Sequence, residues 1–153
     1  MGINIRQKGA EGEREVARSL NSIINAVLKA RSIPVPEKDV VQRNQNQSAV
    51  GGGDLSNVFG LSVEVKRQEQ LAVNTWWAQC EASANRNGEI PVLVYRVNRS
   101  KWRVVMYAEL VLFSATGTQR SMKVRCEVEW EPFLQWFYHW VDAKISAGET
   151  IRS

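Results

Sequence analysis

The amino-terminal part of the chain carries a helical pattern of apolar side chains. Over residues 9–30 these side chains recur at three- and four-residue spacing, which is typical of a helix with one buried face. The residues of this apolar stripe are Val16, Ala17, Leu20, Ile23, Ile24, Val27 and Leu28. Extending the stripe back by one turn leads to Glu13. The pattern therefore predicts a helix that carries a carboxylate on its buried face.

A polar stretch follows over residues 31–53. It is rich in Pro, Asn, Gln, Ser and Gly and ends in three consecutive glycines, Gly51, Gly52 and Gly53. Residues of these types mark turns and loops. We predict a long loop with a short strand around Val40 and Val41, and loops of this length within a compact domain are often functional.

Alternation of apolar and polar residues predicts strands after this loop. Residues 54–66 indicate a pair of strands that turn at residues 57–60, and the second strand alternates strictly. Because side chains two residues apart point to the same side of a strand, Glu64 and Lys66 are predicted to share one face.

The rest of the chain predicts a helix, a hairpin, a further strand and a final helix. Their ranges are 74–87, then 90–97 with 102–107 joined by a turn at 98–101, then 122–130 and 132–146. Pro132 suits the first turn of the final helix. This order of elements predicts an α/β fold with a central mixed β-sheet flanked by α-helices. No repeat divides the chain, so we expect a single domain over residues 1–153.

The chain is rich in tryptophan, with six in all. Trp76 and Trp77 are adjacent on a predicted helix and point in different directions, so we predict that one packs inside while the other meets a partner or DNA. In the final helix, apolar side chains cover more than one stripe. That pattern fits either core packing or a subunit interface.

The composition argues against several classes of protein and of catalytic site. The longest apolar runs are a few residues, far short of the roughly 20 that span a bilayer, and no signal-peptide pattern follows the first residues. We therefore expect an intracellular, cytoplasmic protein without a membrane. Two cysteines and the single histidine, His139, argue against a four-ligand zinc site and against Ser-His or Cys-His catalysis.

The net charge of +4 leans towards a polyanionic partner. Residues 1–103 hold 15 basic and 10 acidic side chains, whereas residues 104–153 hold 5 and 6. The basic excess thus lies in the part of the chain with the candidate site residues. An ordinary solvated surface and nucleic-acid binding both fit this distribution.

The strongest local signal is Asp54 followed ten residues later by Glu64, with Lys66 on the same strand face. Charges on an otherwise apolar strand need an ion pair or a cation, because burying them alone is costly. Carboxylate oxygens suit Mg²⁺. An isolated Glu-x-Lys is usually a half-exposed strand with solvated ends, but the preceding glycines and Glu13 favour a site.

These residues resemble the PD-(D/E)xK nuclease superfamily, and within it the chain is most similar to the archaeal-type Holliday junction resolvases, which also occur in phages. The resemblance rests on four motifs in the family's order, over residues 8–15, 53–55, 64–66 and 88–94 with Trp102-Arg103. It implies a restriction-endonuclease-like fold. Residues 31–53 are longer than the family pattern, and residues 108–153 match no motif.

The resemblance also implies roles for the acidic residues and the lysine. Asp54 and Glu64 would ligate Mg²⁺, or Mn²⁺ in its place, together with the main-chain carbonyl of Val65, and Glu13 would complete the acidic cluster. Lys66 would orient or activate the attacking water and offset charge on the phosphate. Such metal-assisted hydrolysis needs no histidine.

Several polar residues near this motif are candidates for DNA contacts. Arg6, Lys8, Arg14 and Arg67 flank the carboxylates and are suited to bind phosphates, or else are solvated surface charges. Gln68 would bond a phosphate or water, or is an ordinary strand-end residue. Arg43 and the polar run over residues 44–48 would form a flexible loop that touches DNA, or a disordered one when DNA is absent.

The function that follows is a metal-dependent endonuclease that resolves four-way DNA junctions by paired symmetric nicks, acting as a homodimer. A two-fold dimer matches the near two-fold symmetry of such a junction. One alternative is another nuclease of the same superfamily that acts on linear, flap or end structures. A second is a catalytically inactive DNA-binding module, against which the intact acidic residues and Lys66 argue.

Overall fold

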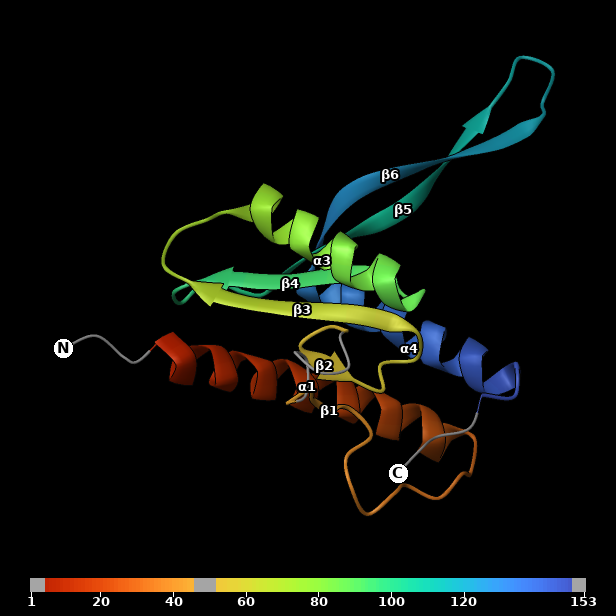
Figure 1. Ribbon diagram of the computed structural model, residues 1–153. Helices are drawn as coiled ribbons and strands as arrows, with labels where there is room; N and C mark the ends of the chain where they lie inside the picture. Colours follow the sequence, from red (N-terminus) through yellow and green to blue (C-terminus); the bar gives the residue numbers. More distant parts are fainter. Residues whose placement is uncertain (1–4, 46–51, 150–153) are drawn as a thin grey trace.

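The computed structural model describes residues 5–45 and 52–149 (Figure 1). The elements, in chain order, are α1 (Ile5–Ala30), β1 (Gln42–Arg43), β2 (Leu55–Ser56), β3 (Leu61–Gln68), α3 (Val73–Asn87), β4 (Ile90–Val97), β5 (Arg103–Phe113), β6 (Gln119–Glu129) and α4 (Trp130–Ser146). Part of the predicted DNA-touching run, residues 46–48, and Gly51 lie outside the described residues.

A four-stranded mixed sheet in the order β3-β4-β5-β6 forms the centre of the fold. β3 and β4 are parallel and are connected through α3, whereas β4–β5 and β5–β6 are antiparallel. The predicted hairpin of β4 and β5 is confirmed. Together with the helices on its faces, this sheet confirms the predicted α/β, restriction-endonuclease-like fold.

The prediction that residues 54–66 form a pair of strands with each other is wrong. β2 pairs antiparallel with β1, with Gln42 opposite Ser56, in a small separate sheet. The chain does turn between β2 and β3, with positive φ at Asn57 and Phe59. The partner strand comes from the long loop because Asn21 on α1 holds that loop against the body through two hydrogen bonds to Val41. The short strand that was predicted around Val40 and Val41 lies two residues later, at Gln42–Arg43.

The helices cover the two faces of the sheet (Figure 1). α1 and α4 pack on one face, where the largest core cluster lies; its central members include Leu20, Leu61, Phe133 and Phe137. α3 covers the other face. There both Trp76 and Trp77 are buried, with only 4% of each exposed, and they pack with Tyr95 and Tyr107.

The prediction that only one of the two tryptophans packs inside is therefore wrong. The sheet supplies a second, separate core on its α3 face, and this second core accommodates both rings. In α4, Phe133, Phe137 and Val141 are buried and the other apolar residues are partly buried against the same core. Core packing thus accounts for much of the apolar surface of the final helix.

β5 and β6 extend beyond the strands predicted at 102–107 and 122–130, and they form a second hairpin. Its two strands stay paired over eleven residues, from Arg103 opposite Glu129 to Phe113 opposite Gln119. The far half extends beyond the body as an arm (Figure 1). α4 follows β6 directly, so it begins at Trp130 and not at Pro132. Among the described helices, none is long and apolar enough to cross a membrane.

Candidate functional site

Asp54 lies against the outer edge of β3. The segment before it runs so close to that strand that a Cβ on Gly53 would lie 2.6 Å from the Val63 carbonyl oxygen. The Asp54 N–H donates to the same carbonyl at 2.8 Å, and the Val65 N–H donates to Asp54 Oδ2 at 2.8 Å. These contacts hold the carboxylate at a defined place beside the strand.

Two further contacts hold the segment that carries Asp54. Ser83 of α3 donates its hydroxyl to the Gly52 carbonyl at 2.8 Å, and the Asn44 side-chain amide donates to the Gly53 carbonyl at 3.0 Å. The glycine-rich approach to Asp54 is thus tied to a helix on one side and to the long loop on the other.

Glu64 stands on β3 next to Asp54 and is buried, with 8% exposed. Its burial, the charge of Asp54 and a hydrogen bond between the two carboxyl groups raise the pKa of Glu64 to about 8, with Glu13 adding to the increase. The charge of Lys66 acts in the opposite direction. Because ionising this buried carboxyl group is unfavourable, a cation nearby would stabilise its charged form.

Glu13 reaches the same place from α1. Burial is the main cause that raises its pKa, the charge of Asp54 adds to this, and the Arg43 guanidinium opposes it. Arg43 Nε lies 2.7 Å from Glu13 Oε2. The structure therefore brings Glu13, Asp54, Glu64 and Lys66 together, and we call these four residues the acidic cluster. Arg43 contacts this cluster through its ion pair with Glu13.

The acidic cluster offers carboxylate oxygens to a divalent ion. Within residues 5–45 and 52–149, no three His, Cys, Asp or Glu side chains are arranged to bind one ion directly. Asp54 and Glu64 are nevertheless in hydrogen-bond contact, and both are oxygen donors. Mg²⁺ is commonly bound through one or two carboxylates while it keeps several waters. The pair therefore fits Mg²⁺, with Glu13 placed to act through water.

The remaining predicted DNA-contacting residues divide into two groups. Arg67 is turned towards α1, where its Nη1 lies 3.7 Å from Glu11 Oε2 and its side chain faces Gly12. Because it is one residue from Lys66 on β3, it points to the opposite side of the strand. Arg6, Arg14 and Gln68 are exposed, and Lys8 is half-buried.

Comparison with known proteins identifies the family. The family model described as "phage putative PDDEXK endonuclease" matches residues 4–137. The chain belongs to this family. The predicted membership of the PD-(D/E)xK superfamily is confirmed, and so is the relation to phages. No curated protein matches the chain.

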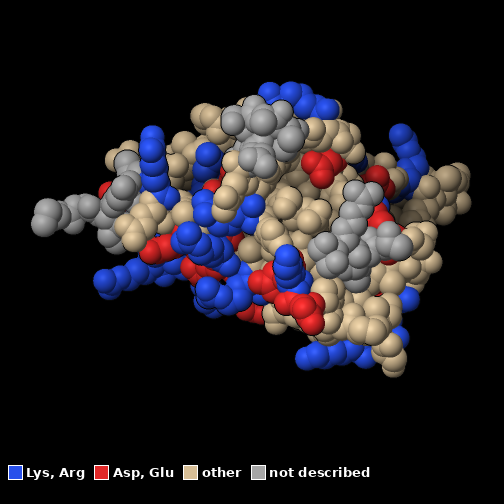
Figure 2. Space-filling model, turned by 60° about the horizontal axis from the view of Figure 1, so that its bottom comes forward, with Lys and Arg blue, Asp and Glu red and all other residues tan. Residues whose placement is uncertain are grey.

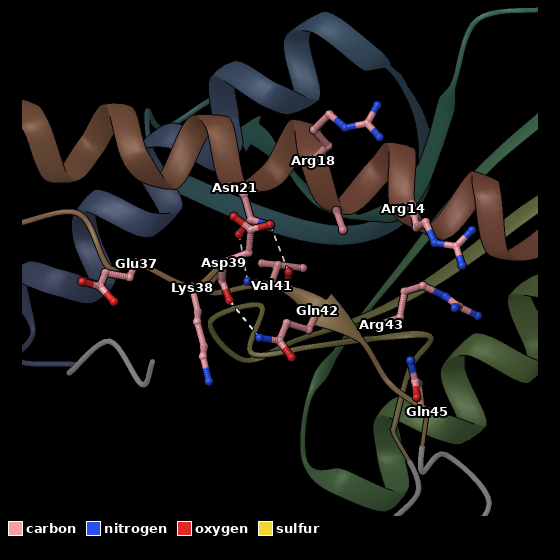
Figure 3. Close-up of a pocket in the computed structure, with 11 residues that line it drawn as sticks. Arg14, Arg18, Asn21, Glu37, Lys38, Asp39, Val41, Gln42, Arg43 and Gln45 are labelled. Carbon is pink, nitrogen blue, oxygen red and sulfur yellow. Dashed lines mark hydrogen bonds between the residues drawn. The ribbon is translucent and has the colours of Figure 1, made fainter.

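A broad hollow lies beside the acidic cluster of this PD-(D/E)xK endonuclease, with a volume of about 680 Å³. It is lined by α1 and the long loop. Its basic residues, Arg14, Arg18, Lys38 and Arg43, outnumber its acidic ones, Glu37 and Asp39. Figure 3 shows Arg14 and Arg18 projecting from α1 and Arg43 extending in the same direction as Arg14. On the face seen in Figure 2, Lys and Arg side chains gather with acidic ones between them.

Among the residues of this hollow that sequence reasoning missed are Arg18, Lys38 and Asn21. Arg18 stands one helical turn after Arg14, so the spacing was a usable signal for it. Asn21 is a polar residue within the apolar stripe, and this could have marked it as an anchor. Lys38 had no such signal, because only the folded loop brings it near α1.

Proposed function

We propose that this endonuclease hydrolyses DNA with Mg²⁺, or with Mn²⁺ in its place, and that it resolves four-way junctions by paired symmetric nicks as a homodimer in the cytoplasm of a phage's host. The observation that carries the proposal is the carboxyl pair of Asp54 and Glu64 at the edge of β3, with Lys66 on the same strand. This arrangement joins two oxygen donors with a cationic amine.

Each residue of the cluster has a distinct task in this proposal. Asp54 and Glu64, with the Val65 carbonyl, hold the ion, which supplies Lewis-acid stabilisation and a more acidic water when bound. Lys66 orients the attacking water and offsets charge that develops on the phosphate. Glu13 orients water from α1, and its ion pair with Arg43 ties the long loop to the reaction centre.

The basic hollow supports DNA as the substrate. Arg14, Arg18, Lys38 and Arg43 line it beside the acidic cluster, so a phosphate backbone lying in the hollow passes the carboxylates. Arginine suits phosphate oxygens because its guanidinium binds them with two parallel hydrogen bonds. Arg6 and Lys8, earlier on α1, are further candidates for phosphate contacts. We assign Arg67 a lesser part, because its side chain faces Glu11.

The catalytic set is tested by Asp54→Asn, Glu64→Gln and Lys66→Ala in the full chain. Each variant should lose cleavage of junction DNA by a factor of at least about 100, since removing one transition-state contact typically costs that much. Each should bind the junction with nearly unchanged affinity, because phosphate contacts elsewhere dominate binding. Glu69→Gln, an exposed carboxylate just beyond β3, is the matched control and should cleave normally. Nicking by purified Asp54→Asn would refute the site.

Substrate choice requires a separate experiment. A synthetic mobile junction, a linear duplex and a flap of the same length are incubated with the enzyme and Mg²⁺. We expect the junction to be cut fastest, with nicks at symmetry-related positions on opposing strands. Equal cleavage of all three would favour the general nuclease, and binding without cleavage in any metal would favour the inactive DNA-binding module.

A further inference from the structure

The outer edge of β6 is an eleven-residue strand edge with no strand beside it among the described residues. It contains no proline, and its pairing with β5 is continuous, without a bulge. Open strand edges of this length tend to pair with another chain unless something blocks them. Charged side chains are the usual block, and β6 carries five of them.

The arm beyond the body is apolar on both of its faces. Leu110, Val111, Leu112 and Phe113 follow one another along β5, so they alternate between faces, and they are exposed by 54%, 50%, 50% and 74%. Met122 on β6 is 56% exposed. No helix covers this part of the hairpin (Figure 1). Apolar side chains gathered in this way mark a surface that meets another molecule.

We propose that β6 pairs antiparallel with β6 of a second copy of this chain, about a two-fold axis at Cys126. In this register Arg125 lies opposite Glu127 of the partner subunit, and Lys123 lies opposite Glu129 of the partner subunit. Val124 faces the partner subunit's Val128. Directly opposed charges of unlike sign stabilise an antiparallel pair, and like charges destabilise it.

The order of charges along β6 selects this register over its neighbours. An axis at Val124 would place Lys123 opposite Arg125, and an axis at Arg125 would oppose two arginines. An axis at Glu127 or at Val128 would oppose glutamates. Of these five axes, only the one at Cys126 places Lys123 and Arg125 opposite glutamates of β6 without opposing like charges. The charges that protect the edge from other strands therefore favour its own copy.

The contacts within one subunit leave room for this pairing. Tyr95 and Arg103 both donate to Oε1 of Glu127, and neither of these two bonds uses Oε2. Arg125 contacts Asn74, a neutral group, and Lys123 lies over the Tyr107 ring. The distal arm of each subunit runs past Glu129 of the partner subunit towards the start of its α4.

Pairing of β6 would provide the surface of the homodimer in the proposed function. It rests on that function only for the use of the dimer, not for its formation. The two sheets would join into one of eight strands, with each β3 at an outer edge. A two-fold axis perpendicular to this sheet keeps both Glu64 side chains on the same side. Seven strand spacings place the two β3 strands on the order of 30 Å apart.

The first test uses Cys126 as a reporter of the axis. Opposed residues in antiparallel strands have Cα atoms about 4.5–5.5 Å apart, within the range that a disulfide spans. Reduced wild-type protein is treated with a mild oxidant, copper-phenanthroline, and run on a non-reducing gel. We expect a band at twice 17.3 kDa for wild type and Cys80→Ser, and none for Cys126→Ser.

The second test measures mass by sedimentation at micromolar concentration without DNA, so it does not depend on nuclease activity. Wild type should sediment at twice 17.3 kDa, and Lys123→Glu at 17.3 kDa. Lys123→Glu with Glu129→Lys in the same chain should restore the dimer, because both opposed pairs are then complementary again. Lys101→Glu makes the same change of charge in an exposed turn and should remain dimeric.

A monomeric wild-type protein, or a dimer that Lys123→Glu does not disturb, would overturn this interface. If the wild type is monomeric and Lys123→Glu instead weakens junction binding several-fold, the arm is a DNA-binding element and the proposal is wrong. In either case, loss of cleavage by Asp54→Asn would still support the proposed chemistry, so the two proposals can fail separately.

Discussion

The position of Asp54 depends on the residue before it, which must approach β3 more closely than any side chain allows. A Cβ at Gly53 would meet both the backbone nitrogen and the carbonyl oxygen of Val63, at 2.7 and 2.6 Å. These are backbone atoms of β3, which is hydrogen-bonded to β4 along its length, so they cannot move aside cheaply. Gly53 therefore acts as a positioning residue for the acidic cluster, although it contributes no chemistry.

We predict that Gly53→Ala moves Asp54 away from Glu64 and lowers the cleavage rate at least tenfold. It should also cost about 1–3 kcal/mol of unfolding free energy, as overpacking usually does. Gly9→Ala is the control, because a Cβ there meets nothing within 4 Å and alanine favours a helix. Rate assays and urea unfolding of both variants distinguish the two effects. A fully active Gly53→Ala enzyme would contradict this account.

The two cysteines differ in burial, and Cys80 is the more deeply buried of the two. Cys80 is fully buried under β3, where its thiol contacts the Ser62 carbonyl, and burial raises its pKa to about 12. Below that pH the thiol stays protonated, and the thiolate is the reactive species.

In a Cys126→Ser variant at pH 8, we therefore predict no reaction of Cys80 with a thiol reagent over minutes and one equivalent of reaction after denaturation. A colorimetric thiol titration with and without urea measures this. Fast labelling of the folded variant would show that α3 opens readily from the sheet.

At the scale of elements, α1 is the frame on which the site is assembled. It carries Glu13, it contributes two arginines to the basic hollow, and it anchors the long loop through Asn21. The Asn21 side chain donates to the Val41 carbonyl at 2.9 Å and accepts from the Val41 N–H at 2.8 Å. This pair of bonds is buried, so neither backbone group of Val41 has water as a ready replacement.

Asn21→Ala should lower the free energy of unfolding by about 2–4 kcal/mol, since it leaves two buried backbone groups without a partner. It should also weaken DNA binding, because Lys38 and Arg43 belong to the loop that it releases. Asn25→Ala, one turn further along α1 and only half-buried, should change both quantities little. Urea unfolding and a binding titration report on the two consequences, and equal behaviour of the two variants would exclude the anchoring role.

At the scale of the whole molecule, the basic hollow should dominate DNA affinity. Each phosphate contact releases counterions, so the affinity should fall at least a hundredfold between 50 and 200 mM salt if five or more contacts form. We predict that Arg14→Ala lowers the slope of log affinity against log salt by about one. Arg86→Ala on α3, outside the hollow, should leave the slope unchanged. An affinity that is insensitive to salt would argue against DNA as the ligand.

The sequence by itself determined the order of the main elements and pointed to the four residues of the acidic cluster. Helical and strand periodicities are local properties, so the ranges of α1, α3 and β4 could be predicted closely. Glu13 lies one turn before the apolar stripe of α1, and Glu64 shares a strand face with Lys66. Charges in such places are conspicuous because burying them is costly.

Only the tertiary structure decided which elements meet. It paired β2 with β1 and not with β3, buried both Trp76 and Trp77, and turned Arg67 towards α1. It also joined Arg43 to Glu13 across thirty residues of chain. Strand partners, core capacity and ion pairs depend on residues far apart in the chain. Local periodicity does not show which distant residues will meet. The sequence pattern therefore identified the candidate residues, whereas packing determined what surrounds them.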